Sequence, residues 1–279
     1  MGSVSIAHDS YLGTLAHRAG QLLARWETIR FLVASNLKAG HRDKALGHLW
    51  NLLDPLLFVG VYFVVFGLLF GQTGRGRAVF VVYLSIGVLA WRFFEGTIAQ
   101  ATLCIKANRG LIHEISFPKA VFPVAVCLSR LYDFLWGLAV LLPILFVAGI
   151  PLTPHALWVA PLIVLHVCFT TGLAFLAAYM GAFFADTANV VNVVMRLLMY
   201  FSPTFYYARG EHGLIPERYL AVYMANPIAC FFEGYRDGLL WGRTPDLSML
   251  LYLVGVSVAV LLAGFAVFAR GEGRFAKYI

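Results

Sequence analysis

The sequence predicts an all-α integral membrane protein with six transmembrane helices. Hydrophobic residues make up 61% of the 279 residues and charged residues only 13%, about half the share in a typical soluble domain. The apolar residues also form six runs close to the 20 or so residues that a helix needs to cross the hydrocarbon core. No polar stretch is long enough for a separate soluble domain. We therefore expect one transmembrane domain over residues 50–279, after a cytoplasmic N-terminal region over residues 1–49.

Six apolar runs are predicted to span the membrane. They lie at about residues 50–71, 78–104, 120–149, 157–184, 190–207 and 248–269. An even number of spans places both chain ends on one side of the membrane. Lys and Arg are concentrated in residues 18–44, 106–119 and 270–277, on that same side, and such an excess marks the cytoplasmic face. Both termini are therefore predicted to be cytoplasmic.

Charge and cysteine usage exclude two other classes. The net charge of +7 is accounted for by the cytoplasmic loops, so no nucleic-acid partner is expected. The four cysteines are scattered without a C-x-x-C pair, which predicts neither a disulfide framework nor a zinc site. The histidines show no H-E-x-x-H spacing, and no metal site or catalytic residue is predicted.

Residues 21–38, QLLARWETIRFLVASNLK, predict an amphipathic helix that lies in the cytoplasmic interface. One face carries five apolar residues: Leu22, Trp26, Ile29, Val33 and Leu37. Three polar residues lie away from that face: Arg25, Thr28 and Asn36. Trp26 would anchor the helix at the headgroup level. The alternative is a helix whose apolar face packs on the rest of the protein.

Residues 108–123, NRGLIHEISFPKAVFP, are too polar to span and lie between the second and third spans. Asn108 is a reasonable N-cap for a short helix over 109–116, which Phe117-Pro118 would end. Three apolar residues would face the membrane, namely Leu111, Ile112 and Ile115, while His113 and Glu114 would face outward. The alternative is a simple connector.

Residues 207–247 alternate polar turns with apolar pieces too short to span. They predict two short re-entrant or interfacial helices on the outer side, hinged at Asn226-Pro227. A plain extracellular loop is the alternative, and the density of Leu, Phe, Tyr and Trp argues against it.

Charged residues also occur inside the apolar runs, where they usually face a cavity or each other. Three oppositely charged pairs stand three residues apart: Arg92–Glu95, Arg130–Asp133 and Glu233–Arg236. Arg130–Asp133 is interpreted mainly as structural, and Arg92 is the best candidate to face a polar cavity. Arg196 has no partner nearby in the sequence, so we expect it to face the cavity or to pair across helices.

Four stretches in this order carry a resemblance to a known family: LGHLWNLLDPLL, NRGLIHEISFPKAVFP, GAFFADTANVVNVVMRLLMYFSPTFY and YMANPIACFFEGYRDGLL. Together they resemble the membrane subunits of ABC-2 type exporters, most closely those that export O-antigen, capsule or teichoic-acid polysaccharides. The resemblance covers the chain from about residue 22 onward. The chain departs from the family at Ala185, where the family commonly has Arg. The next residue, Asp186, matches the acidic residue of the family, and the absence of Arg puts a salt bridge from position 185 in doubt.

The resemblance implies roles for two cytoplasmic segments. The loop after the second span would be the coupling helix that docks on a partner ATPase through Asn108, Arg109, Leu111, Ile112, His113 and Glu114. The N-terminal helix would be the gate helix, with Arg25, Trp26 and Arg30, which also touches the ATPase. The family further implies a homodimer that binds two ATPase copies in the bacterial inner membrane.

Aromatic residues, 15% of the chain, suit a pore for a polymer of sugars, because their rings stack on the apolar faces of sugars. With Arg92, a channel lining is predicted from spans one, two and five: Tyr62, Phe63, Phe66, Trp91, Phe94, Tyr200, Phe201, Phe205 and Tyr206. For a single ring, a lipid-facing or interfacial position is the alternative.

The predicted function is the transmembrane subunit of an ATP-driven exporter for a polysaccharide or lipid-linked polysaccharide. The chain has no G-x-x-x-x-G-K-[ST] loop, so ATP and Mg are expected on a separate ATPase and not on this non-enzymatic subunit. Alternatives are an ABC-2 exporter of a small drug or lipid, and a membrane-embedded transferase acting on lipid-linked sugars. A secondary transporter is disfavoured, since neither internal repeats nor coupling carboxylates are evident.

Overall fold

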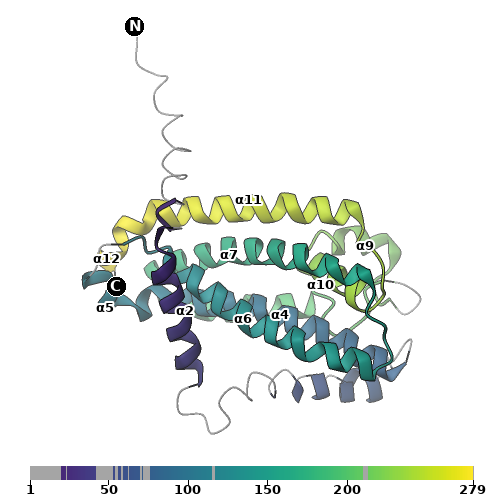
Figure 1. Cartoon of the computed structure of the whole chain (residues 1–279). Helices are drawn as coiled ribbons and strands as arrows, with labels where there is room; N and C mark the ends of the chain where they lie inside the picture. Colours follow the sequence, from purple (N-terminus) through teal and green to yellow (C-terminus); the bar gives the residue numbers. More distant parts are fainter. Residues whose placement is uncertain are drawn as a thin grey trace.

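The computed structural model describes residues 20–22, 24–41, 53, 56–57, 59–61, 63–69, 71, 76–114, 117–209 and 213–278. The described residues form a bundle of α-helices (Figure 1). Among these residues, four helices are long and apolar enough to cross a membrane: α4 (Arg77–Ala107), α6 (Val121–Val147), α7 (Val159–Phe183) and α11 (Leu247–Gly271). At 31 residues α4 is about 46 Å long, and α11, at 25 residues, is about 38 Å long. The second, third, fourth and sixth predicted spans are therefore confirmed as helices of spanning length.

The centre of the bundle is α7, which packs against α4, α6 and α11. Its buried residues are mostly apolar and small, and include Ala174, Ala178 and Ala182 along one face. Small side chains let neighbouring backbones approach closely, which is how helices gain packing energy in a lipid environment. This packing holds the four long helices side by side.

The prediction for the fifth span is wrong in its second half. Helix α8 (Thr187–Tyr200) has 14 residues and is about 21 Å long, shorter than the roughly 30 Å hydrocarbon core. Residues 201–208 follow it as a non-helical segment that contains Pro203. The first predicted span is only partly described, and η1 (Phe63–Leu69) forms a π-helix within it. A six-span layout is thus not confirmed.

The two short helices expected between residues 207 and 247 are present as α9 (Glu217–Tyr223) and α10 (Pro227–Leu239). The Asn226 side chain accepts a hydrogen bond from the Ile228 backbone amide at 3.0 Å. Pro227 occupies the first helical position, where its missing N–H costs nothing, so the sequence starts α10 at this point. All residues of α10 from Ile228 to Leu239 are buried, which is inconsistent with a plain loop.

Short elements gather at the other end of the bundle, opposite α9 and α10 (Figure 1). They are α5 (Arg109–Glu114), η3 (Glu272–Arg274), α12 (Phe275–Tyr278) and one end of α2 (Trp26–His41), which crosses the bundle. The remaining short element, η2 (Pro154–Trp158), leads into α7 and packs against α10.

Helix α2 packs on α6 and leaves part of its surface exposed. Ile29 and Leu32 are buried, as the packing alternative requires. The placement of Asn36 away from the apolar face is wrong, because its side-chain amide donates to the Ser129 hydroxyl of α6 at 3.4 Å. Trp26 is 51% exposed within this chain, so its role as an interface anchor stays a prediction.

Removal of the Asp246 side chain should loosen the first turn of α11. The Asp246 carboxylate accepts hydrogen bonds from the backbone amide and the hydroxyl of Ser248, both at 3.0 Å, and these bonds lower its pKa. This support is present above about pH 4 and is lost as the pH falls through the lowered pKa. In hydrogen exchange, Asp246→Ala should speed exchange at Ser248 and Met249, whereas Asp246→Ser should not. Equal rates in both variants would contradict the cap.

Candidate functional site

The predicted coupling segment forms the expected short helix. Within α5, Ile112 is buried and Leu111 half-buried, while Arg109 and His113 are exposed. This division agrees with the predicted inner and outer faces. The side chain of Glu114, and residues 115–116, lie outside the described part of the chain.

Asn108 directly precedes α5, as predicted, but its side chain does not cap that helix. Its side-chain amide donates to the Cys104 carbonyl at 2.8 Å, so it closes the end of α4 and does not cap α5. Its backbone carbonyl still accepts from the Ile112 amide at 3.2 Å, which is the first bond of α5. Asn108 therefore joins α4 to α5 with only one residue between them. A displacement of α5 would be passed directly into α4.

A cavity of about 510 Å³ lies beside the connection that leads into α6. Its lining comes from residues 21–25 before α2, residues 117–120 before α6, and the end of α11 with η3: Gln21, Leu22, Ala24, Arg25, Phe117, Pro118, Ala120, Phe265 and Glu272. The Lys119 backbone amide donates to the Glu272 carboxylate, which links the α5–α6 connection to the end of α11. Arg25 brings the one cationic side chain among these lining residues. Of the other gate-helix residues, Trp26 and Arg30 are exposed.

A second cavity, of about 370 Å³, lies between α4, α6 and the segment that follows α8. It is lined by Val88, Leu89, Trp91, Arg92, Phe93, Glu95, Gly96, Ala99, Arg130, Asp133, Phe134, Met199, Thr204 and Phe205. Arg92 is the middle residue of α4, so this cavity lies far from both ends of a helix of spanning length. The prediction that Arg92 faces a polar cavity agrees with this placement.

The polar groups of the central cavity are organised in pairs. Arg130 forms an ion pair with Asp133 at 3.6 Å, as predicted, and its Nε also donates to the Gln100 side-chain carbonyl at 3.0 Å. The Glu95 carboxylate, expected to pair with Arg92, accepts a hydrogen bond from the Trp91 indole at 2.8 Å. The link between Arg130 and Gln100 could not be predicted from the sequence, because the two residues belong to different helices.

The cavity therefore presents cationic donors, anionic acceptors and an aromatic ring to the same space. This combination can bind hydroxyl groups, which both donate and accept hydrogen bonds. Within the residues that the structure describes, no three His, Cys, Asp or Glu side chains come together to hold a metal ion.

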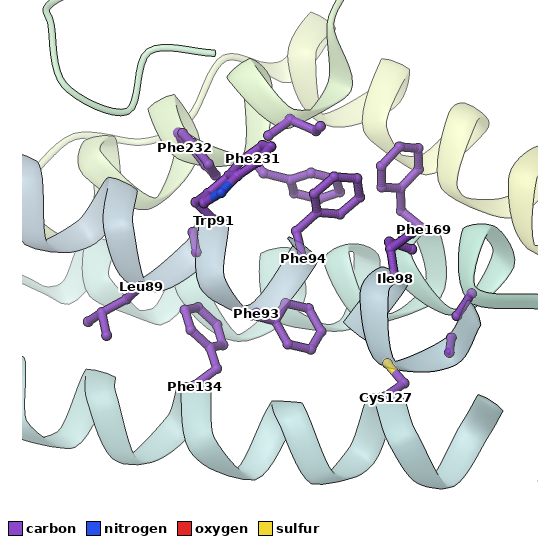
Figure 2. Close-up of a cluster of buried hydrophobic side chains, with 14 of the residues drawn as sticks. Leu89, Trp91, Phe93, Phe94, Ile98, Cys127, Phe134, Phe169, Phe231 and Phe232 are labelled. Atoms are coloured by element: carbon purple, nitrogen blue, oxygen red, sulfur yellow. The ribbon is translucent and has the colours of Figure 1, made fainter. Parts of the chain in front are cut away.

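The predicted aromatic lining is divided between the interior and the surface. Trp91 and Phe205 are buried and border the central cavity. Phe94 is 1% exposed and stacks on Phe169 with ring centroids 6.0 Å apart, inside the aromatic cluster of Figure 2. In this structure Phe94 reaches no surface, and it could meet a cargo only if α4 and α7 separated.

The other predicted lining residues have different surroundings. Tyr200 and Phe201 are exposed at the end of α8. Phe63 is half-buried, and so is Tyr206, whose hydroxyl forms a hydrogen bond with the Tyr223 hydroxyl at 2.8 Å. Tyr62 and the side chain of Phe66 lie outside the described residues. Arg196, expected to face a cavity or a helix partner, is exposed on α8.

Comparison with known proteins places these features in a family. The model of the ABC-2 type transporter family matches residues 27–240. The O-antigen export system permease protein RfbA of Klebsiella pneumoniae is 28% identical over 248 residues, which cover 88% of this chain and 92% of that protein. RfbA of Myxococcus xanthus is 26% identical over 249 residues, covering 89% and 94%. The polysialic acid transport protein KpsM of Escherichia coli is 21% identical over 258 residues, covering 88% and 93%. This chain belongs to the ABC-2 type transporter family.

Proposed function

We propose that this chain is the transmembrane subunit of an exporter that moves a polysaccharide, or a lipid-linked polysaccharide, from the cytoplasm across the inner membrane. One observation carries the proposal: relatives named as O-antigen export permeases align with 88–89% of this chain and more than nine-tenths of their own length. The charged and aromatic central cavity supports a cargo rich in hydroxyl groups. Its four charged lining residues, Arg92, Glu95, Arg130 and Asp133, favour such a cargo over a small apolar drug or lipid.

The proposed exporter is a homodimer driven by two copies of a cytoplasmic ATPase, which bind ATP and Mg. Residues 1–49 would form the cytoplasmic region and residues 50–279 the transmembrane domain. ATP binding would move the ATPases against α5 and the gate helix α2. The first predicted span and α8, which remains of the fifth, would then shift between the two protomers and admit the glycan. A polyprenyl pyrophosphate at the lipid end would meet cationic side chains at the cytoplasmic interface, where Arg25 borders the 510 Å³ cavity.

Deletion of the gene tests the choice of cargo. Loss of this subunit should remove a glycan from the cell surface and leave polyprenyl-linked polymer inside the cell. Both products can be measured, by surface staining and by lipid extraction. Normal surface glycan with lost efflux of a small compound would instead support the drug or lipid exporter, and a lipid-linked sugar left unmodified would support a transferase.

Complementation with a cavity-filling variant tests the route. Ala99→Trp places a large ring in the 370 Å³ cavity and should lower export strongly. Leu103→Trp is the matched control, since Leu103 lies one turn further along α4, is 52% exposed and does not border the cavity. Membrane abundance of both variants is measured by immunoblot. Full export by an abundant Ala99→Trp variant would exclude this cavity from the path.

A further inference from the structure

The helix ends after α8, and we call the non-helical residues 201–208 the break. Their backbone carbonyls form no hydrogen bonds within a helix. Residues 201–208 are non-helical, and most of them are buried inside the bundle. Two of these residues, Thr204 and Phe205, form part of the wall of the central cavity. Non-helical backbone at membrane depth is stable only where other groups supply its hydrogen bonds.

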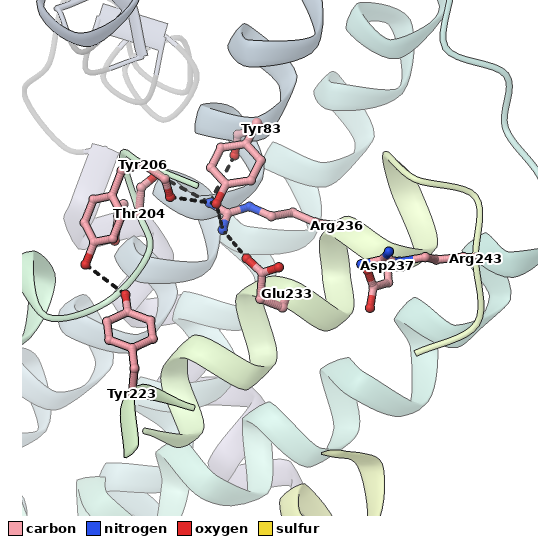
Figure 3. Close-up of polar contacts among 8 residues, drawn as sticks. All are labelled: Tyr83, Thr204, Tyr206, Tyr223, Glu233, Arg236, Asp237 and Arg243. Atoms are coloured by element: carbon pink, nitrogen blue, oxygen red, sulfur yellow. Dashed lines mark hydrogen bonds and ion pairs between the residues drawn. The ribbon is translucent and has the colours of Figure 1, made fainter. Parts of the chain in front are cut away.

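Arg236 of α10 supplies the first donor (Figure 3). Its side chain is fully buried, and Nη2 donates to the carbonyls of Thr204 and Tyr83, both at 3.4 Å. Its Nη1 donates to the Tyr83 hydroxyl at 2.7 Å and to the Glu233 carboxylate at 3.0 Å. The guanidinium carbon also lies 3.4 Å from the centre of the Tyr83 ring. One side chain therefore connects α10, α4 and the break.

Tyr83 of α4 supplies the second donor. Its hydroxyl accepts from Arg236 and donates to the Tyr206 carbonyl at 2.7 Å. Gly87, one turn further along α4, leaves the space that this arrangement needs. A Cβ at Gly87 would lie 2.7 Å from Arg236 Nη2 and 2.8 Å from the Thr204 carbonyl oxygen. The approach of the three segments thus depends on a glycine as well as on hydrogen bonds.

The same segment is linked to α9. The Tyr206 hydroxyl bonds with the Tyr223 hydroxyl at 2.8 Å and donates to the Tyr200 carbonyl at 3.0 Å. Asn226, between α9 and α10, donates to the Ser202 hydroxyl at 3.1 Å. Polar contacts therefore run from the end of α8 to both short helices.

A buried ion pair adds little net stability, because the desolvation of its charges offsets their attraction. Its geometric requirements are strict, however, since an arginine guanidinium offers its donors in a fixed planar arrangement. We propose that Arg236 is a positioning residue: with Tyr83 and Glu233 it fixes the 201–208 segment to α4 and α10. The cavity wall at Thr204 and Phe205 then moves together with the α9–α10 pair and not independently of it. The proposal does not depend on what the cavity transports.

Cysteine labelling of the full-length chain in membranes tests this coupling of the cavity wall to α9 and α10. Thr204 is fully buried, so a cysteine at this position, with the four native cysteines replaced by alanine, should react slowly with a membrane-permeant maleimide. Arg236→Lys keeps the charge but cannot reach both carbonyls and Tyr83 together. It should speed labelling at position 204 about tenfold or more, the factor expected from the loss of a charged hydrogen bond.

Arg243→Lys is the matched control. Arg243 also pairs with an acid of α10, Asp237, at 2.7 Å, but its side chain is exposed and makes no contact with the break. It should leave the labelling rate unchanged. If Arg236→Lys does not accelerate the labelling of Thr204→Cys, the proposal is overturned. Equal acceleration by Arg236→Lys and Arg243→Lys would show a general loosening of the fold and would overturn it as well.

A milder variant covers the case in which Arg236→Lys does not fold. Tyr83→Phe keeps the ring under the guanidinium and removes only the hydroxyl that joins Arg236 to the Tyr206 carbonyl. It should accelerate labelling at Thr204→Cys by a smaller factor than Arg236→Lys. Tyr132→Phe, on α6 and away from the network, should not. No acceleration in a folded Tyr83→Phe variant would also overturn the proposal.

Discussion

Gly264→Ala is expected to destabilise the folded protein by about 3 kcal/mol, the upper end of the range for overpacking a core. The cause is the contact between α11 and α7. A Cβ at Gly264 would overlap the Gly172 carbonyl oxygen and lie 3.1 Å from its Cα. On the other side, a Cβ at Gly172 would lie 2.5 Å from the Val260 carbonyl oxygen. Backbone meets backbone here, so no flexible side chain can move aside.

The gain in helix propensity does not offset this clash. Alanine favours a helix over glycine by about 1 kcal/mol, which is less than the cost of separating the two helices. Gly255→Ala isolates the propensity effect, because Gly255 lies on the same helix and a Cβ there would meet nothing within 4 Å. Thermal unfolding in detergent should show a lowered midpoint for Gly264→Ala and an unchanged or raised one for Gly255→Ala. Equal midpoints would mean that α7 and α11 do not pack at this point.

Reversal of charge on the outer face of α5 is expected to abolish coupling to the ATPase while the fold is retained. Arg109 and His113 are exposed, whereas Ile112 holds the helix on the bundle. Arg109→Glu with His113→Glu therefore changes only the surface proposed for docking. The loss of more than about 1.4 kcal/mol of binding free energy at such a surface lowers the affinity for the ATPase tenfold or more. The measurements are retention of the ATPase by the tagged chain and glycan export.

The control for α5 is Arg77→Glu. Arg77 is also an exposed cation, at the opposite end of α4, where a cytoplasmic ATPase would not reach. This variant should retain the ATPase and export normally. If the α5 double variant still retains the ATPase and exports at the level of Arg77→Glu, the ATPase does not dock on α5.

Local sequence predicted much of the candidate site. The helix at 109–114 followed from polar residues between two apolar runs, and α10 followed from Asn226-Pro227, which cap and start a helix without outside help. The Arg130–Asp133 and Glu233–Arg236 pairs were also predictable, because residues three apart lie on the same side of a helix. Each of these features depends on contacts between near neighbours in the chain.

Features that depend on distant contacts could not be predicted in this way. Pro203 gives a local reason for a helix to end near Tyr200, but nothing near it in the sequence shows that the non-helical residues 201–208 are mostly buried. The break is stable because Arg236, far along the chain, donates to the Thr204 carbonyl. Likewise Phe94 lies only two residues from Arg92, yet α7 buries the first while the second borders a cavity.

Composition and periodicity alone thus predicted an all-helical membrane protein. Within the described part of the chain, four helices are long and apolar enough to cross a membrane. Composition and periodicity also located the two segments proposed to meet the ATPase. Only the tertiary structure decided which charges share a cavity and where a predicted span is broken. The reason is physical: helix formation is set by neighbouring residues, whereas the burial of a ring or a carbonyl depends on what another helix places against it.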